Sequence, residues 1–117
     1  MRISEIRDIL DASVLCGDEH LDKIVVGGGG ADLMDDVLAA VAEDAVLLTG
    51  LTTEQVLRTA KLAGVNAIVF VRGKKPEAPD IELAQSYEIP ILLTRYSLFV
   101  ACGRLYMNGL RGLDGSW

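Results

Sequence analysis

Hydrophobic positions follow two periods along this chain, and both are clearest between Ala45 and Gly73. Two short and almost continuous apolar runs, Ala45–Leu48 and Ala67–Val71, are typical of parallel strands that are covered on both faces. Between them, apolar residues recur at helical spacing, and Gly64 can provide the left-handed residue that ends a helix. Because two parallel strands need a crossover connection, the stretch predicts a right-handed β-α-β unit.

The start of the helix in this unit is predicted from local capping signals. Thr52 can accept a hydrogen bond as the N-cap residue, and Gln55 stands three residues later, where a capping box needs it. Leu51 and Val56 would then form the hydrophobic staple.

The same patterns predict further elements on both sides of this unit, and no linker divides the chain. We expect strands at 13–17, Lys23–Val26 and Ile89–Thr94, and helices at Ser4–Asp11, Leu33–Ala42 (capped by Asp32), Pro79–Glu88 and from Ser97 to about Asn108. The predicted fold class is α/β, a compact layered domain with a mainly parallel central sheet flanked by helices and built from βαβ repeats. Residues 1–117 are expected to form a single domain.

Four consecutive glycines, Gly27–Gly30, admit two interpretations. One is a phosphate-binding loop between a strand and a helix. The other is a connection, or a place where another backbone comes close. The run lacks the third glycine of the dinucleotide fingerprint, and no Gly-Lys-Ser/Thr follows it. Acidic residues in the next helix would also repel a phosphate, so the second interpretation is favoured.

Charge and composition narrow the classes of function. The net charge of −6 is uneven, because residues 1–44 carry three Lys or Arg against eleven Asp or Glu, whereas residues 45–117 carry eight against six. An acidic chain argues against nucleic acid and anionic membranes as partners. No apolar run approaches the roughly 18 residues of a membrane span, so we expect a cytoplasmic protein. One histidine, His20, and the unpaired spacing of Cys16 and Cys102 predict no metal site, and no cofactor is expected.

A candidate binding site follows from the predicted sheet, because ligands bind outside the carboxyl ends of parallel strands. Three strand ends, two helix starts and several cations meet at that edge, which favours a small anion such as a nucleotide. The predicted ligand-binding residues are Thr49, Gly50, Thr52, Arg72, Thr94, Arg95 and Ser97, with Lys74 and Lys75 nearby. The alternative is that these residues are solvated loops and ordinary helix caps.

Catalysis has less support in the sequence, and no catalytic residue is predicted. Ser97 does not stand in a G-x-S-x-G elbow, and there is no second histidine for a triad. A small transferase or hydrolase would need a site that the sequence does not contain.

The last predicted helix has an apolar arc that is too wide for a helix that covers only one face of a sheet. Phe99, Gly103 and Tyr106 are therefore predicted dimer contacts, and we expect a homodimer. The alternative is that the helix is simply well buried in its own domain.

Two segments of the chain resemble the DRTGG domain family. They are LLTGLTTEQVLRTAKLAGVNAIVFVRGKKP at residues 47–76 and EIPILLTRYSLFVACGRLY at residues 88–106, and the segment Gly27–Val41 extends the likeness. The chain is also similar to the N-terminal domain of bacterial HPr kinase/phosphorylase, whose kinase activity resides in a separate domain with a phosphate loop that this chain lacks. The contiguous string DRTGG, after which the family is named, does not occur in this sequence.

The resemblance implies an α/β fold and a dimerising, non-catalytic module of the kind found beside CBS pairs in regulatory regions. Together with the strand-end residues, it leads to a stand-alone regulatory domain that senses a small anionic ligand, such as a nucleotide, or a partner protein. The alternative is a structural subunit that dimerises and docks on a partner enzyme without binding any small molecule.

Overall fold

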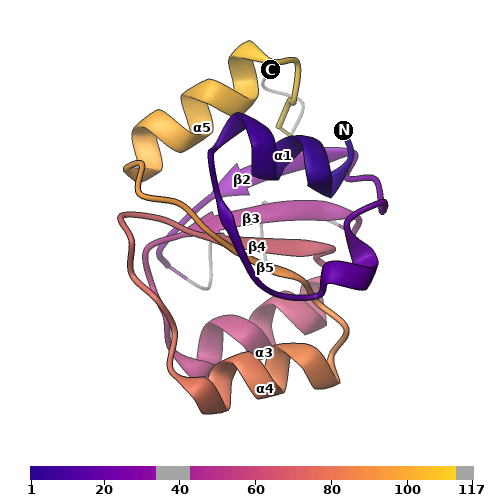
Figure 1. Cartoon of the computed structure of the whole chain (residues 1–117), viewed down its shortest axis with the longest axis vertical. Coiled ribbons are helices and arrows are strands. Elements are labelled where there is room, and N and C mark those ends of the chain that lie inside the picture. Colours follow the sequence, from indigo (N-terminus) through magenta and orange to yellow (C-terminus); the bar gives the residue numbers. More distant parts are fainter. Residues whose placement is uncertain (34–42, 113–117) are drawn as a thin grey trace.

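The computed structural model describes residues 1–33 and 43–112, which form a five-stranded sheet with helices on both faces (Figure 1). The strands are β1 (Ser13–Cys16), β2 (Gly27–Gly30), β3 (Ala45–Thr49), β4 (Ala67–Phe70) and β5 (Ile91–Leu93). The helices are α1 (Ile3–Ile9), α3 (Glu54–Ala63), α4 (Ala78–Ser86) and α5 (Leu98–Met107), with a short 3-10 helix, η1, at Asp18–His20. The helix predicted at Leu33–Ala42 falls on residues 34–42, which lie outside the described residues.

The strands lie in the order β1-β5-β4-β3-β2. The pairs β2–β3, β3–β4 and β4–β5 are parallel, whereas β1 runs antiparallel to β5 at one edge. This arrangement confirms the predicted α/β class with a mainly parallel sheet, and β3-α3-β4 is the predicted crossover unit. Because β1 is antiparallel, its first residue, Ser13, lies opposite Leu93 at the carboxyl end of β5.

The core lies on both faces of the sheet, as continuous apolar strands require. Figure 1 shows α1 and α5 over one face and α3 and α4 over the other. Alternate residues of β3 point to opposite faces: Val46 and Leu48 pack in the cluster with α1 and α5, whereas Ala45 and Leu47 pack in the cluster with α3 and α4. All four side chains are buried.

The glycine run is a strand, and the prediction of a strand at Lys23–Val26 is wrong. Gly27–Gly30 forms β2, which pairs in parallel with β3. A Cβ atom at Gly30 would lie 2.7 Å from Sγ of Cys102, and one at Gly28 would lie 3.0 Å from Cδ2 of Leu110. The glycines therefore allow side chains of α5 and of the residues after it to approach the sheet closely, and they form neither a phosphate-binding loop nor a loose connection.

The start of α5 agrees with the predicted helix cap, whereas the start of α3 differs from it. The N-cap of α3 is Thr53, without a side-chain cap, so the capping box that the sequence predicts at Thr52 and Gln55 is wrong. At α5 the predicted cap is confirmed, because the Ser97 hydroxyl accepts a hydrogen bond from the Val100 N–H at 3.2 Å. Gly64 ends α3 in the predicted left-handed conformation, with φ of 76°.

One side of α5 faces solvent. Ala101 and Leu105 are buried against the sheet, whereas Phe99 is 88% exposed, Met107 87% and Tyr106 46%. The alternative that this helix is simply well buried in its own domain is therefore wrong. The predicted dimer contact through Phe99, Gly103 and Tyr106 stays a prediction.

Both cysteines are free, Cys16 buried and Cys102 half-buried. Burial raises the pKa of both thiols, because it disfavours the thiolate. Within residues 1–33 and 43–112, no helix is long and apolar enough to cross a membrane.

Candidate functional site

The seven predicted ligand-binding residues all lie at the carboxyl edge of the sheet, but the structure divides them between two places. Thr49 and Gly50 stand at the end of β3, and Thr94 and Arg95 stand just after β5. Arg72, two residues beyond β4, lies against Gly50, since a Cβ atom there would be 2.6 Å from Nη2 of Arg72.

At the end of β3, a carboxylate of the protein itself occupies the hydrogen-bond donors. Oδ1 of Asp32 accepts a hydrogen bond from the Gly50 N–H at 2.8 Å and another from the Thr49 hydroxyl at 3.1 Å. The Thr49 hydroxyl also accepts from the Leu51 N–H at 3.2 Å. The donors predicted to hold an anion at this strand end therefore already hold one.

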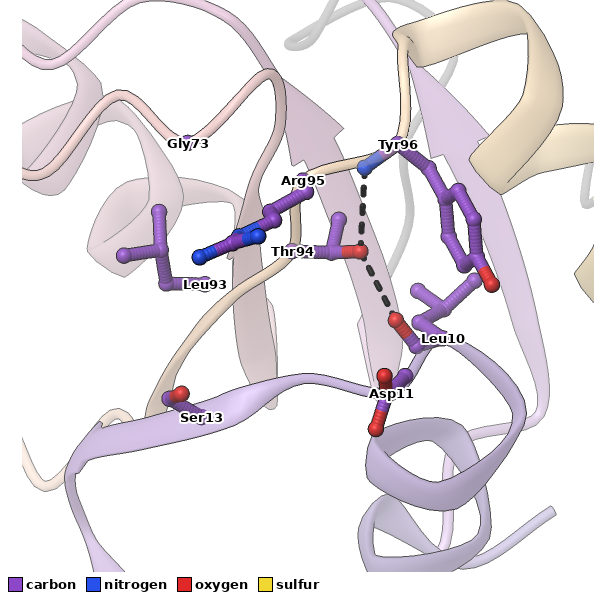
Figure 2. Close-up of a pocket in the computed structure, with 8 residues that line it drawn as sticks. All are labelled: Leu10, Asp11, Ser13, Gly73, Leu93, Thr94, Arg95 and Tyr96. Atoms are coloured by element: carbon purple, nitrogen blue, oxygen red, sulfur yellow. Dashed lines mark hydrogen bonds between the residues drawn. The ribbon is translucent and has the colours of Figure 1, made fainter.

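At the end of β5, Thr94 joins the strand to α1. Its buried hydroxyl donates to the Leu10 carbonyl at 2.8 Å and accepts from the Tyr96 N–H at 3.3 Å (Figure 2). The loop after β4 is tied to the same segment, because the Gly73 N–H donates to the Thr94 carbonyl at 2.9 Å. These bonds fix the backbone around the end of β5.

Beside Thr94 the surface is hollowed, with a volume of about 490 Å³. Figure 2 shows the residues that line this hollow: Leu10, Asp11, Ser13, Gly73, Leu93, Thr94, Arg95 and Tyr96. They come from the end of α1, the start of β1, the loop after β4 and the segment after β5. We refer to it below as the β5 hollow.

Opposite charges lie on two sides of the β5 hollow. Figure 2 shows Arg95 on one side, with Asp11 and Ser13 on the other. All three are exposed, and their side chains form no hydrogen bond or ion pair with any residue that the structure describes. The Tyr96 ring forms a further side, and the guanidinium of Arg104 lies 4.3 Å from its centroid.

The other predicted residues are not part of the lining of the β5 hollow. The Ser97 hydroxyl caps α5, and the half-buried Thr52 precedes the N-cap of α3. Lys74 and Lys75 are exposed in the loop after β4. Neither these lysines nor Arg72 forms a side-chain ion pair within the described part of the chain.

Sequence reasoning missed Asp11, Ser13 and Tyr96. Tyr96 could have been found, because it lies between the predicted residues Arg95 and Ser97. Asp11 and Ser13 gave no such signal, since they reach the edge only because β1 pairs antiparallel with β5.

The side chains that line the β5 hollow are suited to binding a ligand with charged and hydroxyl groups. The lining of the β5 hollow includes neither histidine nor cysteine. Among residues 1–33 and 43–112, no group of three or more His, Cys, Asp or Glu side chains is placed to hold a metal ion. His20 lies on η1, where its Nε2 is 3.4 Å from the Glu19 carboxylate.

A comparison with curated proteins found no match. Among solved structures, the chain is similar to the CBS and DRTGG domains of the regulatory region of Clostridium perfringens pyrophosphatase, crystallised with the activator diadenosine tetraphosphate. The TM-score is 0.74 at 18% sequence identity, over 89% of this chain and 45% of that one. At this identity the likeness shows the fold, and the chain spans less than half of that structure.

A family model provides the assignment that the structural likeness alone does not. The model of the DRTGG domain matches residues 5–106, which include the whole sheet, nearly all of the described helical residues and both segments that carry the resemblance. The chain therefore belongs to the DRTGG domain family.

Proposed function

We propose that this domain is a non-catalytic regulatory module that binds a small anionic ligand in the β5 hollow, and that this ligand is a nucleotide. The observation that carries the proposal is a hollow of about 490 Å³, beside which the Arg95 guanidinium forms no ion pair with any described residue. Small-molecule sites typically have volumes of roughly 300–1,000 Å³. The hollow also lies outside the carboxyl ends of parallel strands, where ligands of open α/β sheets bind.

An anionic ligand is favoured by the charges around this edge. Arg95 can form two parallel hydrogen bonds to a phosphate group, which suits the planar guanidinium. Arg72, Lys74 and Lys75 add positive charge on the neighbouring loop. We propose that Arg72 and Arg95 supply the charge for binding, whereas Thr49, Thr94 and Ser97 hold the loops in place through the hydrogen bonds described above.

A nucleotide is favoured over a bare anion by the other sides of the hollow. The half-buried side chains of Leu93 and Tyr96 supply apolar surface that a base can cover. The regulatory region of the structurally similar pyrophosphatase was crystallised with a dinucleotide activator, which supports testing this class of ligand first.

Calorimetric titration and thermal unfolding test the proposal with AMP, ADP, ATP, diadenosine tetraphosphate and inorganic phosphate. At about a hundred times its Kd, a ligand stabilises the folded state by about 2.7 kcal/mol. For a domain of this size, that is a rise in Tm of very roughly ten degrees. Arg95→Ala should weaken binding by about tenfold or more, because it removes a charged hydrogen-bond donor.

The matched control is Arg58→Ala, which removes the same charge from an exposed side chain on α3. Its ion pair with Glu54, at 2.8 Å, is exposed as well and contributes little to stability. We expect ligand affinity to stay at the wild-type value in this variant. If no compound in the panel raises the Tm, or if Arg95→Ala and Arg58→Ala bind alike, the proposed site is wrong.

A second candidate function is favoured by the exposed apolar side of α5. In this alternative the domain is a structural subunit that dimerises, or docks on a partner enzyme, through Phe99, Tyr106 and Met107. Exposed aromatic and methionine side chains are enriched at protein interfaces. Light scattering at high protein concentration tests it: the wild type should be a dimer, and Phe99→Ser should shift it toward the monomer. A wild-type monomer would contradict the dimer, whereas the ligand site would be unaffected.

A further inference from the structure

The β5 hollow has a feature that a site for a bare anion does not need. The carboxylate of Asp11 lies on the side opposite Arg95, where it would repel a phosphate that approached it. The two side chains do not form an ion pair with each other. A ligand that spans the hollow must therefore carry negative charge at one end and hydrogen-bond donors at the other.

The backbone at Asp11 adds a second observation. Asp11 follows the C-cap residue of α1 with φ of 48°, in the left-handed region where glycine is the usual residue. The Ala12 N–H donates to the Arg7 carbonyl at 2.9 Å, which closes the end of the helix. Aspartate is one of the few residues other than glycine that adopt this conformation readily. The backbone therefore fixes the Asp11 carboxylate at the side of the β5 hollow, opposite Arg95.

We propose that Asp11 accepts hydrogen bonds from the ribose hydroxyls of a ribonucleotide whose phosphate is bound by Arg95. The inference rests on the proposed function and names its ligand class more closely. A carboxylate that accepts from ribose hydroxyls selects against ligands without them, because a bound deoxy analogue leaves the carboxylate desolvated and unpaired. The Ser13 hydroxyl lies on the same side and can share this contact.

The test compares three probes on two proteins. The probes are the ribonucleotide that binds most tightly, its 2′,3′-dideoxy analogue and inorganic phosphate, and the proteins are the wild type and Asp11→Asn. Asparagine tolerates the left-handed conformation, so the variant should fold. In the wild type, loss of the hydroxyls should weaken binding by about tenfold, the range of a hydrogen bond to a charged group. Asp11→Asn should lose a similar factor for the ribonucleotide and should bind the dideoxy analogue almost as the wild type does.

Asp8→Asn is the matched control, because Asp8 is an exposed carboxylate three residues earlier on α1 that pairs with Arg7 at 3.0 Å. It should leave all three affinities unchanged. Phosphate binding should be unchanged or stronger in Asp11→Asn, because a repulsive charge is removed.

The outcomes separate this inference from the proposed function. If the wild type binds a nucleotide through Arg95 but Asp11→Asn binds it equally well, or if the dideoxy analogue binds equally well, the role of Asp11 is overturned and the site stands. If the wild type binds neither nucleotide nor phosphate, both proposals are overturned. A ligand that binds independently of Arg95 overturns both placements.

Discussion

Thr49 ends β3 and Thr94 follows β5, and in both places the threonine hydroxyl accepts a hydrogen bond from the N–H two residues later. The two differ in what the hydroxyl donates to. Thr49 donates to the exposed carboxylate of Asp32, whereas Thr94 donates to the backbone carbonyl of Leu10. The same local turn therefore holds the Asp32 carboxylate at the end of β3, whereas after β5 it holds the end of α1.

This difference explains why a side chain of the protein occupies the end of β3, whereas the surface beside the end of β5 is hollowed. At β3, Asp32 satisfies the donors that an incoming anion would use. At β5, the bond to Leu10 holds α1 at the side of the strand end and leaves the space between Arg95 and Asp11 unfilled. A strand end with suitable hydrogen-bond donors is therefore a candidate site only where no side chain of the protein already uses them.

The largest expected effect compares the two threonines. Thr94→Val should lower the free energy of unfolding by about 1–3 kcal/mol, because it leaves the buried Leu10 carbonyl and the Tyr96 N–H without their partner. Thr49→Val should cost less, about 1 kcal/mol, because the exposed Asp32 carboxylate can turn to water. Urea unfolding followed by circular dichroism measures both. A cost for Thr49→Val equal to or above that for Thr94→Val would contradict the distinction between the two ends.

A smaller effect is expected when the Asp32 carboxylate is removed from the end of β3. Asp32→Ala frees the Gly50 N–H and the Thr49 hydroxyl and removes a negative charge from the edge that carries Arg72. Phosphate affinity should rise by about fivefold, which corresponds to about 1 kcal/mol of relieved repulsion. The measurement is calorimetric titration with phosphate.

Asp22→Ala is the control for this variant, since Asp22 is an exposed carboxylate whose ion pair is with Arg2, at 3.8 Å. It should leave phosphate affinity unchanged. Equal phosphate affinity in Asp32→Ala and the wild type would show that Asp32 does not keep anions from this strand end.

Much of the fold could be predicted because its signals are local and strong. The continuous apolar runs at β3, β4 and β5 were predicted at nearly their observed bounds, because a strand that is buried on both faces must be apolar throughout. The strand at Gly27–Gly30 could not be predicted, since glycine has no side chain to show a pattern and normally weakens a strand. Its reason is the closeness of Cys102 and Leu110, more than 70 residues later in the chain.

The candidate site was predicted only to the level of the sheet edge. Parallel strands bring their carboxyl ends to one edge, so Thr49, Arg72 and Arg95 could be grouped from the sequence alone. The sequence placed Asp32 at the start of a helix and gave no sign that its carboxylate contacts Thr49. That contact joins residues 17 positions apart through the folded β2–β3 pair.

Local sequence patterns predict the apolar strands, the crossover helix, the cap at Ser97 and the end of α3 at Gly64, because each depends on neighbours within a few residues. Which strand end is hollowed depends on the tertiary structure. The antiparallel pairing of β1 with β5 brings Asp11 and Ser13 to Arg95, and the fold of β2 brings Asp32 to Gly50. Such contacts depend on strand order and register, which local patterns of hydrophobicity leave open.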